Sequence, residues 1–207
     1  LIKQLAAQGA RPIALSRSAD AVIEGATKVI PWRTGQETEL RDVLSRVNIL
    51  IINHGINVHG DRTADAIAKS LEVNALSAWR LMEIFLETVD NRLGPATKEL
   101  WINTSEAEVN PAFSPFYETS KRLLGDLITL RRQDSPCVIR KLVLGPFKSN
   151  LNPVGVMSAE WIAGVIVALA KRDIRNIIVT INPLTYLLFP IKETMQSLYF
   201  KLFSKRS

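Results

Sequence analysis

The sequence has very little cysteine and histidine. Its 207 residues include one cysteine, Cys137, and two histidines, so no intramolecular disulfide can form and no metal site is predicted. A lone thiol is compatible with a reducing, cytoplasmic setting. The chain also lacks an apolar run near the ~18 residues that a membrane-spanning helix needs. The longest such run, from Ile162 to Ala170, is about half that length.

The positive charge is moderate and spread along the chain. The formal net charge is +6 with a pI near 9.6, but lysine and arginine do not gather into a stripe. This pattern predicts a general preference for anionic ligands and no nucleic-acid interface. With 47% hydrophobic residues, the chain can bury the core of one domain.

Strand and helix patterns alternate along the chain. We expect strands at 12–15, 28–32, 48–52, 99–103, 138–144 and 176–181, and helices at 36–47, 63–89, 114–132 and 158–171. The alternation predicts a Rossmann-like α/β fold, a doubly wound, mostly parallel sheet in three α/β/α layers, with ligands at the carboxyl ends of the strands. We expect this domain over 1–185 and a basic amphipathic tail over 186–207. Because the first nine residues look like the end of a mid-fold helix that stops at Gly9, we expect the domain to be incomplete at its N-terminus.

Tyr117, Lys121 and Ser105 form a candidate proton-transfer site. A tyrosine hydroxyl has a pKa of about 10, and a fixed positive charge is needed to make it useful near neutrality. Residues four apart share one face of a helix, so Lys121 can supply that charge to Tyr117. The alternative is a packed tyrosine beside a surface lysine. Small and polar residues also end four expected strands, at 16–17, 53–55, 105 and 145–146, where a ligand would cross the sheet edge or where turns simply form.

These residues together resemble the short-chain dehydrogenase/reductase family from Leu1 to about Ile181. The matches are Tyr117 and Lys121 to its Tyr-x-x-x-Lys, Ser105 to its serine, Asn53-His54-Gly55 to the end of its Asn-Asn-Ala-Gly, Asn74 to its catalytic asparagine, and the segment Gly145 to Ser149 to its Pro-Gly-x-x-x-Thr. The chain also resembles the dehydrogenase part of a fused sterol-desaturase/dehydrogenase polypeptide. The family's Gly-rich phosphate-binding turn would lie before Leu1.

The resemblance implies an NAD(P)-dependent oxidoreductase that transfers a hydride between a nicotinamide and a carbonyl or alcohol carbon. Tyr117 would be the general acid/base, Lys121 would lower its pKa and bind the nicotinamide ribose, and Ser105 would hold the substrate oxygen. Asn74 lies on an apolar helix stripe and needs a polar partner, either a water linked to the lysine or a neighbouring backbone group. Ser16 and Arg17, without an acid at that strand end, favour NADP(H) over NAD(H), unless Arg17 is merely solvated. The expected cofactor-binding residues are Ser16, Arg17, Asn53, His54, Gly55, Tyr117, Lys121, Gly145, Phe147 and Ser149.

The sequence allows more than one interpretation of the expected substrate pocket and of the C-terminal tail. Apolar residues near the expected site predict a lipophilic small-molecule substrate, or else fill the core. They are Phe113, Phe116, Phe147, Leu151 and Met157. The segment 191–207 suits either peripheral membrane contact or packing on its own domain or a dimer mate. The resemblance implies a homodimer or homotetramer, and the alternative function is a non-catalytic cofactor-binding or membrane-peripheral interaction protein.

Overall fold

The computed structural model of the chain describes residues 1–18, 20–89, 98–149 and 152–205. Leu151 of the expected substrate pocket and Arg206 of the basic tail lie outside these ranges. The N-terminal helix ends as expected, since Gly9 takes a left-handed φ of 84° and its amide donates to the carbonyl of Ala6.

The strands form two separate parallel ladders. The first ladder pairs β1 (Ile13–Ser16) with β2 (Lys28–Pro31). The second has the order β3-β4-β5-β6, formed by Ile49–Ile52, Glu99–Asn103, Val138–Leu144 and Asn176–Val179. Every pairing is parallel, which confirms the expected fold class. Within the described ranges, no strand pairs with both β1 and β3.

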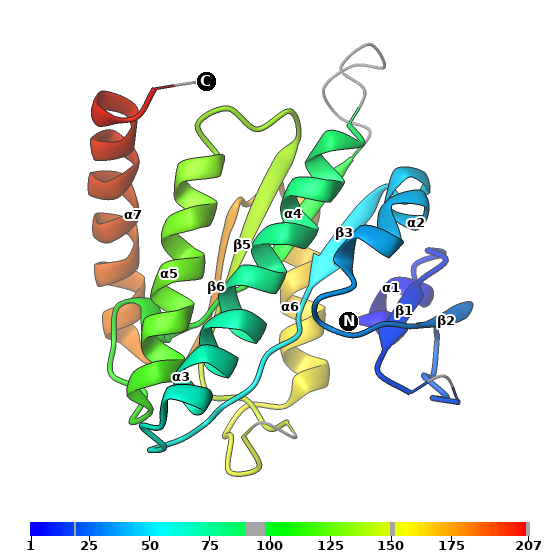
Figure 1. The fold of residues 1–207 in the computed structure, drawn as a ribbon, viewed down its shortest axis with the longest axis horizontal. Helices are drawn as coiled ribbons and strands as arrows, with labels where there is room; N and C mark the ends of the chain where they lie inside the picture. The colour runs from blue at the N-terminus through cyan, green and yellow to red at the C-terminus, as the bar shows by residue number, and fades with distance from the viewer. Residues whose placement is uncertain (19, 90–97, 150–151, 206–207) are drawn as a thin grey trace.

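Helices cover both faces of the larger sheet (Figure 1). They are α1 (Ile2–Ala6), α2 (Arg41–Arg46), α3 (Ala64–Leu71), α4 (Ser77–Glu87), α5 (Pro115–Arg131), α6 (Ala159–Lys171) and α7 (Pro183–Phe203), with short turns η1 (Glu37–Leu40), η2 (Glu72–Leu76) and η4 (Glu106–Glu108). Side chains alternate across a strand, so Leu100 and Ile102 of β4 join a core with α2, α4 and α5, whereas Trp101 joins a second core with α6. This gives the three α/β/α layers.

The long helix expected at 63–89 is divided. Thr63 caps α3 by accepting a hydrogen bond from the amide of Ala66. A π-helical turn, η2, then separates α3 from α4 and carries the buried Asn74. Such turns change which residues face a neighbouring helix, and they are common at functional sites.

The C-terminal helix is longer than the expected one, which starts after Pro190. Helix α7 begins at Pro183, where Asn182 accepts a hydrogen bond from the amide of Leu184 at 3.1 Å, and it continues through Pro190. It runs beside α5 at the edge of the molecule (Figure 1). None of the described helices is long and apolar enough to cross a membrane.

Candidate catalytic and cofactor-binding site

Ser105, Tyr117 and Lys121 come together at the carboxyl end of β4. Ser105 follows this strand and caps η4 through a hydrogen bond from the amide of Ala107. Tyr117 and Lys121 lie on the first turns of α5, and the Lys121 Nζ is 5.8 Å from the centre of the Tyr117 ring. Lys121 is only 3% exposed, and its Nζ donates to the carbonyl of Asn103, the last residue of β4, at 3.2 Å. The lysine is therefore buried at the strand end and is not a surface residue.

Local hydrogen bonds determine where α5 begins. Pro115 occupies the first turn, where its missing amide hydrogen costs nothing. The Ser114 hydroxyl donates to Asn57 Oδ1 at 2.7 Å, and the His59 carbonyl lies at 3.1 Å as a second acceptor for the same hydrogen. This ties the helix start to the loop after β3. Glu118 accepts a hydrogen bond from the amide of Ala112 at 2.8 Å. These contacts hold the first turns of α5, and with them Tyr117, against the sheet edge.

Burial dominates the electrostatics of the pair. Desolvation lowers the pKa of Lys121 to about 8, and the charge of Glu108 opposes this shift. Desolvation also raises the pKa of Tyr117, opposed by its hydrogen bond with Ser105. The charge of Glu106 raises the pKa of Tyr117 further. A lowering of this pKa by Lys121 stays a prediction.

Asn74 joins three segments of the site. Its Nδ2 donates to the carbonyl of Ile56 at 3.0 Å and to the Ser120 hydroxyl at 3.0 Å, with a longer contact to Ser70 at 3.3 Å. Its Oδ1 accepts a hydrogen bond from the amide of Ile56 at 2.8 Å. Of the two partners expected for Asn74, the structure shows the backbone. Sequence analysis missed both serine partners. Ser70 is four residues from Asn74 and the helical spacing could have indicated it, whereas Ser120 is brought to Asn74 only when α3 and α5 pack together.

Gly55 permits the close approach of Asn74. A Cβ on Gly55 would lie 3.0 Å from Asn74 Oδ1, which is closer than ordinary packing, and 3.9 Å from Lys121 Nζ, which is ordinary contact, so a larger residue would push at Asn74. Its neighbour Asn53 accepts a hydrogen bond from Asn103 Nδ2 at 2.6 Å. The segment 53–55 and the end of β4 therefore form one polar edge.

His54 is packed against Trp32, with ring centroids 5.3 Å apart in an edge-to-face arrangement. Burial lowers the pKa of His54 to about 4, with a further lowering by Lys121, so the imidazole is neutral near pH 7. It keeps a hydrogen bond to the backbone of Val73. This agrees with a hydrogen-bonded turn histidine and disfavours a general base. The contact with Trp32 could not be foreseen from sequence spacing.

The remaining expected cofactor residues lie at other strand ends. Ser16 and Arg17 end β1 in the separate ladder, beyond β3 from α5 (Figure 1). The Ser16 hydroxyl accepts a hydrogen bond from the amide of Ser18 at 3.2 Å, and Arg17 is exposed and forms no ion pair within the described part of the chain. Its guanidinium is therefore available to an anionic group.

The turn after β5 requires a glycine at position 145 because Thr180 packs against it. A Cβ on Gly145 would lie 2.3 Å from the hydroxyl of Thr180, so the approach of β5 to the end of β6 requires glycine. Phe147 forms a bridge to Met157, and Ser149 exchanges backbone hydrogen bonds with Asn152. Met157 is buried in the core, whereas Phe113 is 98% exposed and fills no core.

Several buried polar groups at this edge lack partners in the described structure. They are the Nε2 of His54, the Oδ1 of Asn103 and the Nε1 of Trp32. The ammonium of Lys121 carries three N–H donors, and within the described structure one of them has an acceptor, the carbonyl of Asn103. A buried polar group without a partner is costly, so these groups fit a ligand with several hydroxyl and amide groups. A nicotinamide dinucleotide is such a ligand.

The parallel sheet and the residues gathered at its carboxyl edge define a Rossmann-like α/β protein with the fold of the short-chain dehydrogenases/reductases. No family model matches the chain. A short-chain dehydrogenase from Sphingobium yanoikuyae in complex with NADPH superposes with a TM-score of 0.78 at 15% identity, over 99% of this chain and 90% of that one. The bulky-bulky ketone specific alcohol dehydrogenase from Comamonas testosteroni gives a TM-score of 0.76 at 16% identity, over 99% and 90%. An alcohol dehydrogenase from Thermococcus sibiricus complexed with 5-hydroxy-NADP gives 0.71 at 18%, over 86% and 88%.

The sequence itself is much more similar to a curated protein of Synechocystis sp., monoglucosyldiacylglycerol epimerase. The two are 58% identical over 213 residues, which cover all of this chain. The chain spans 52% of the length of that relative, so about half of the relative has no counterpart here.

Proposed function

We propose that the protein is an NADP-dependent oxidoreductase that inverts a secondary alcohol carbon in the sugar headgroup of a glycolipid. The observation that carries the proposal is the buried Lys121 beneath Tyr117, next to Ser105, in a chain 58% identical to a glycolipid epimerase. Inversion of a carbinol carbon requires its hydrogen to leave one face and return to the other. NADP, when bound, supplies a group that accepts and returns that hydride, so the two halves cancel and no net oxidation occurs.

The residues of the chain would handle the proton and the orientation of the substrate. Tyr117 takes the proton of the sugar hydroxyl at its phenolic oxygen in the first half and returns it in the second. Ser105 donates to the sugar oxygen and holds it near Tyr117. Because epimerisation uses both directions of proton transfer, the tyrosine needs no net supply of protons.

Lys121 and Arg17 would hold the cofactor. The ammonium of Lys121 is charged below about pH 8 and has two N–H groups free for ribose hydroxyls. The exposed guanidinium of Arg17, at the end of β1, suits a 2′-phosphate and supports NADP over NAD. Asn53, His54 and Gly55 would line the same edge.

Tyr117→Phe is the direct test. Turnover of monoglucosyldiacylglycerol in mixed micelles, with NADP in catalytic amount, should fall by about 10² to 10⁴ in this variant. Tyr186→Phe is the matched control, since the Tyr186 hydroxyl bonds only the backbone of Thr180, and its turnover should stay near wild type. Unchanged turnover in Tyr117→Phe would refute the mechanism.

Two further measurements separate the proposal from its alternatives. NADPH binding, followed by cofactor fluorescence, should saturate and should weaken in Arg17→Ala; no binding at all would favour a protein without cofactor. Turnover that consumes NADPH in proportion to product would indicate a simple reductase of a carbonyl substrate. Binding without any turnover would support the non-catalytic cofactor-binding alternative.

A further inference from the structure

Helix α7 exposes a continuous apolar stripe. Its six residues follow helical spacing on one face and are 49–69% exposed. They are Leu184, Leu187, Ile191, Met195, Leu198 and Leu202, and we call them the α7 stripe. An apolar row of this length is unusual on a soluble surface and marks an interaction site.

The opposite face of α7 is firmly held, so the stripe cannot turn inward. Phe189 is fully buried, and Glu193 accepts a hydrogen bond from the buried Lys141 at 2.6 Å. Lys192 pairs with Glu108 and Asp126, each at 2.9 Å. The rotation of the helix about its axis is therefore set by buried contacts, and these contacts leave the stripe facing outward.

The charges beside the stripe are positive. The sole acid of α7, Glu193, forms ion pairs with Lys141 and Arg132. Lys201, on the last turns of the helix, forms no ion pair among the described residues, and neither does Arg175. The exposed part of α7 thus combines apolar side chains with one unpaired cation, Lys201, and no exposed acid, and Arg175 adds a second cation from the loop before β6.

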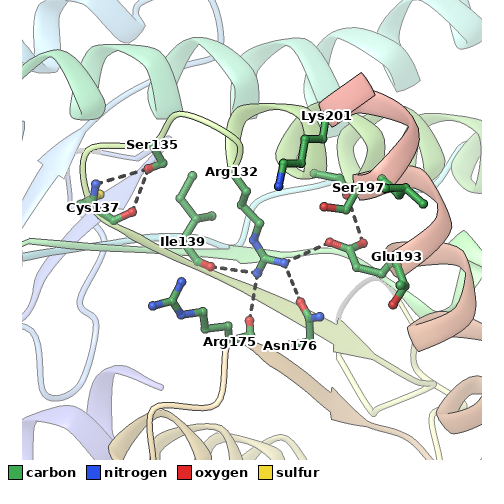
Figure 2. Close-up of a pocket in the computed structure, with 12 residues that line it drawn as sticks. Arg132, Ser135, Cys137, Ile139, Arg175, Asn176, Glu193, Ser197 and Lys201 are labelled. Carbon is green, nitrogen blue, oxygen red and sulfur yellow. Dashed lines mark hydrogen bonds and ion pairs between the residues drawn. The ribbon is translucent and has the colours of Figure 1, made fainter. Parts of the chain in front are cut away.

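A cavity of about 530 Å³ lies next to the stripe. Figure 2 shows Arg132, Arg175 and Lys201 around it. Two serines also line it: Ser135, whose hydroxyl donates to the carbonyl of Cys137, and Ser197, whose hydroxyl accepts from Gln133. Both terminal nitrogens of the Arg132 guanidinium already have partners: Nη1 donates to Glu193 and Asn176, and Nη2 donates to two backbone carbonyls. The cations that remain for a ligand are Arg175 and Lys201. Leu198 lines the cavity and also belongs to the α7 stripe, so the basic cavity and the apolar surface form one continuous site.

We propose that the α7 stripe and this cavity dock onto a bilayer that contains anionic phospholipid, with the stripe in the interfacial region and lipid phosphates at Lys201 and Arg175. Amphipathic helices with an apolar face and flanking lysines bind such surfaces. A second copy of the chain fits less well, because α7 has no exposed acid and a two-fold contact between the stripes would leave Lys201 without a carboxylate partner on the facing helix. The inference stands on this surface alone and does not require the proposed epimerase activity.

Docking would also place the candidate site near the lipid. The Thr185 hydroxyl, in the first turn of α7, donates to Glu106 and accepts from Asn110 Nδ2, at 3.2 and 2.8 Å. Both partners belong to the segment that follows Ser105. A bilayer that contacts the stripe would therefore lie close to the part of the candidate site that contains Ser105.

Vesicle flotation of the full chain tests the inference without using activity. The chain should float with phosphatidylcholine vesicles that contain about 30% phosphatidylglycerol, less with pure phosphatidylcholine, and less as salt rises above ~0.1 M. Leu198→Glu should weaken flotation at least about tenfold. Val22→Glu, a matched change of an exposed apolar residue far from α7 in the sequence, should leave flotation unchanged.

A second variant tests the cavity. Arg175→Gln/Lys201→Gln should reduce binding to the anionic vesicles to the level seen with pure phosphatidylcholine. Far-UV circular dichroism and the urea midpoint should match wild type in each variant, which separates lost docking from misfolding. Inorganic phosphate should compete only weakly, since the stripe adds contacts that a free ion lacks.

Three outcomes would overturn the inference. The first is a wild-type chain that does not float with anionic vesicles. The second is Leu198→Glu floating as well as wild type. The third is a dimer in size-exclusion chromatography that Leu198→Glu dissociates, without vesicle binding, which would assign the stripe to a second copy.

Discussion

Gly125 in the middle of α5 should tolerate no side chain. A Cβ on Gly125 would lie 2.1 Å from Oε2 and 2.3 Å from Cδ of Glu108, distances that no non-bonded atoms sustain. The carboxylate of Glu108 is buried and holds Lys192 at 2.9 Å and Lys141 at 3.6 Å. Lys141 in turn donates to the carbonyl of Gly125 at 2.9 Å. Gly125→Ala must therefore displace a buried ion-pair network.

The change in the free energy of unfolding caused by Gly125→Ala is the sum of two costs and one gain. Overpacking costs about 1–3 kcal/mol, and disrupting one partner of a buried ion pair costs up to about 3–5 kcal/mol. Alanine in a helix returns about 0.5–1 kcal/mol relative to glycine. We expect a net loss of about 2–4 kcal/mol, a large share of the ~5–15 kcal/mol typical of a domain.

Gly164→Ala in α6 is the matched control. Nothing lies within 4 Å of a Cβ at Gly164, so this substitution should stabilise the protein by about 0.5–1 kcal/mol. Urea unfolding followed by circular dichroism measures both, and the midpoints should shift in opposite directions at similar slope. A Glu108→Ala background should remove most of the penalty of Gly125→Ala. A neutral Gly125→Ala, or a penalty that persists without Glu108, would refute the reasoning.

Two further predictions concern pH. Since the pKa of His54 is about 4 in the folded protein and about 6.5 when unfolded, the unfolded state binds more protons between these values. Stability should be full above about pH 6.5 and fall by up to about 3 kcal/mol toward pH 4; His54→Gln should flatten this part of the urea-midpoint profile, and an unchanged slope would contradict the assignment. Since the pKa of Lys121 is about 8, its charge is present below that pH and is lost above it. NADPH affinity should therefore decline as pH rises through 8 in wild type, and Lys121→Met should bind weakly at every pH, whereas a wild-type decline that survives in Lys121→Met would place the titrating group elsewhere.

The strands were predictable because their signal is local. The segments 99–103 and 138–144 become β4 and β5 with the same bounds, since buried parallel strands are rich in apolar residues. The buried Arg140 and Lys141 of β5 are exceptions to this pattern. The helix over 63–89 was predicted without its π turn, because apolar spacing does not report a single widened turn. Helix α7 was expected only after Pro190, a residue that normally interrupts helices. The structure carries the helix through Pro190 on the exposed side.

The candidate site was predictable only where its residues lie in short motifs. Tyr117 and Lys121 are four apart, and helical geometry alone puts them on one face. Ser70 is also four residues from Asn74, but Ser120 bonds Asn74 from a separate helix, and no spacing rule connects Asn74 with Ser120. Trp32 beside His54 and Glu108 beside Gly125 are likewise tertiary contacts. The motifs therefore identify the reacting groups, and folding supplies the residues that position them.

The buried charges around Lys141 are better explained by positioning than by stability. An ion pair inside a protein often gains no more than an apolar replacement would, yet here Lys141 and Arg132 hold Glu193 of α7, and Glu108 holds Lys192 of the same helix. Glu108 belongs to η4, the turn that Ser105 caps. One network thus sets the rotation of α7, which turns its apolar stripe outward, and anchors the segment that carries Ser105. A substitution that breaks these ion pairs should therefore disturb both the α7 stripe and the candidate site, although the two share no residue.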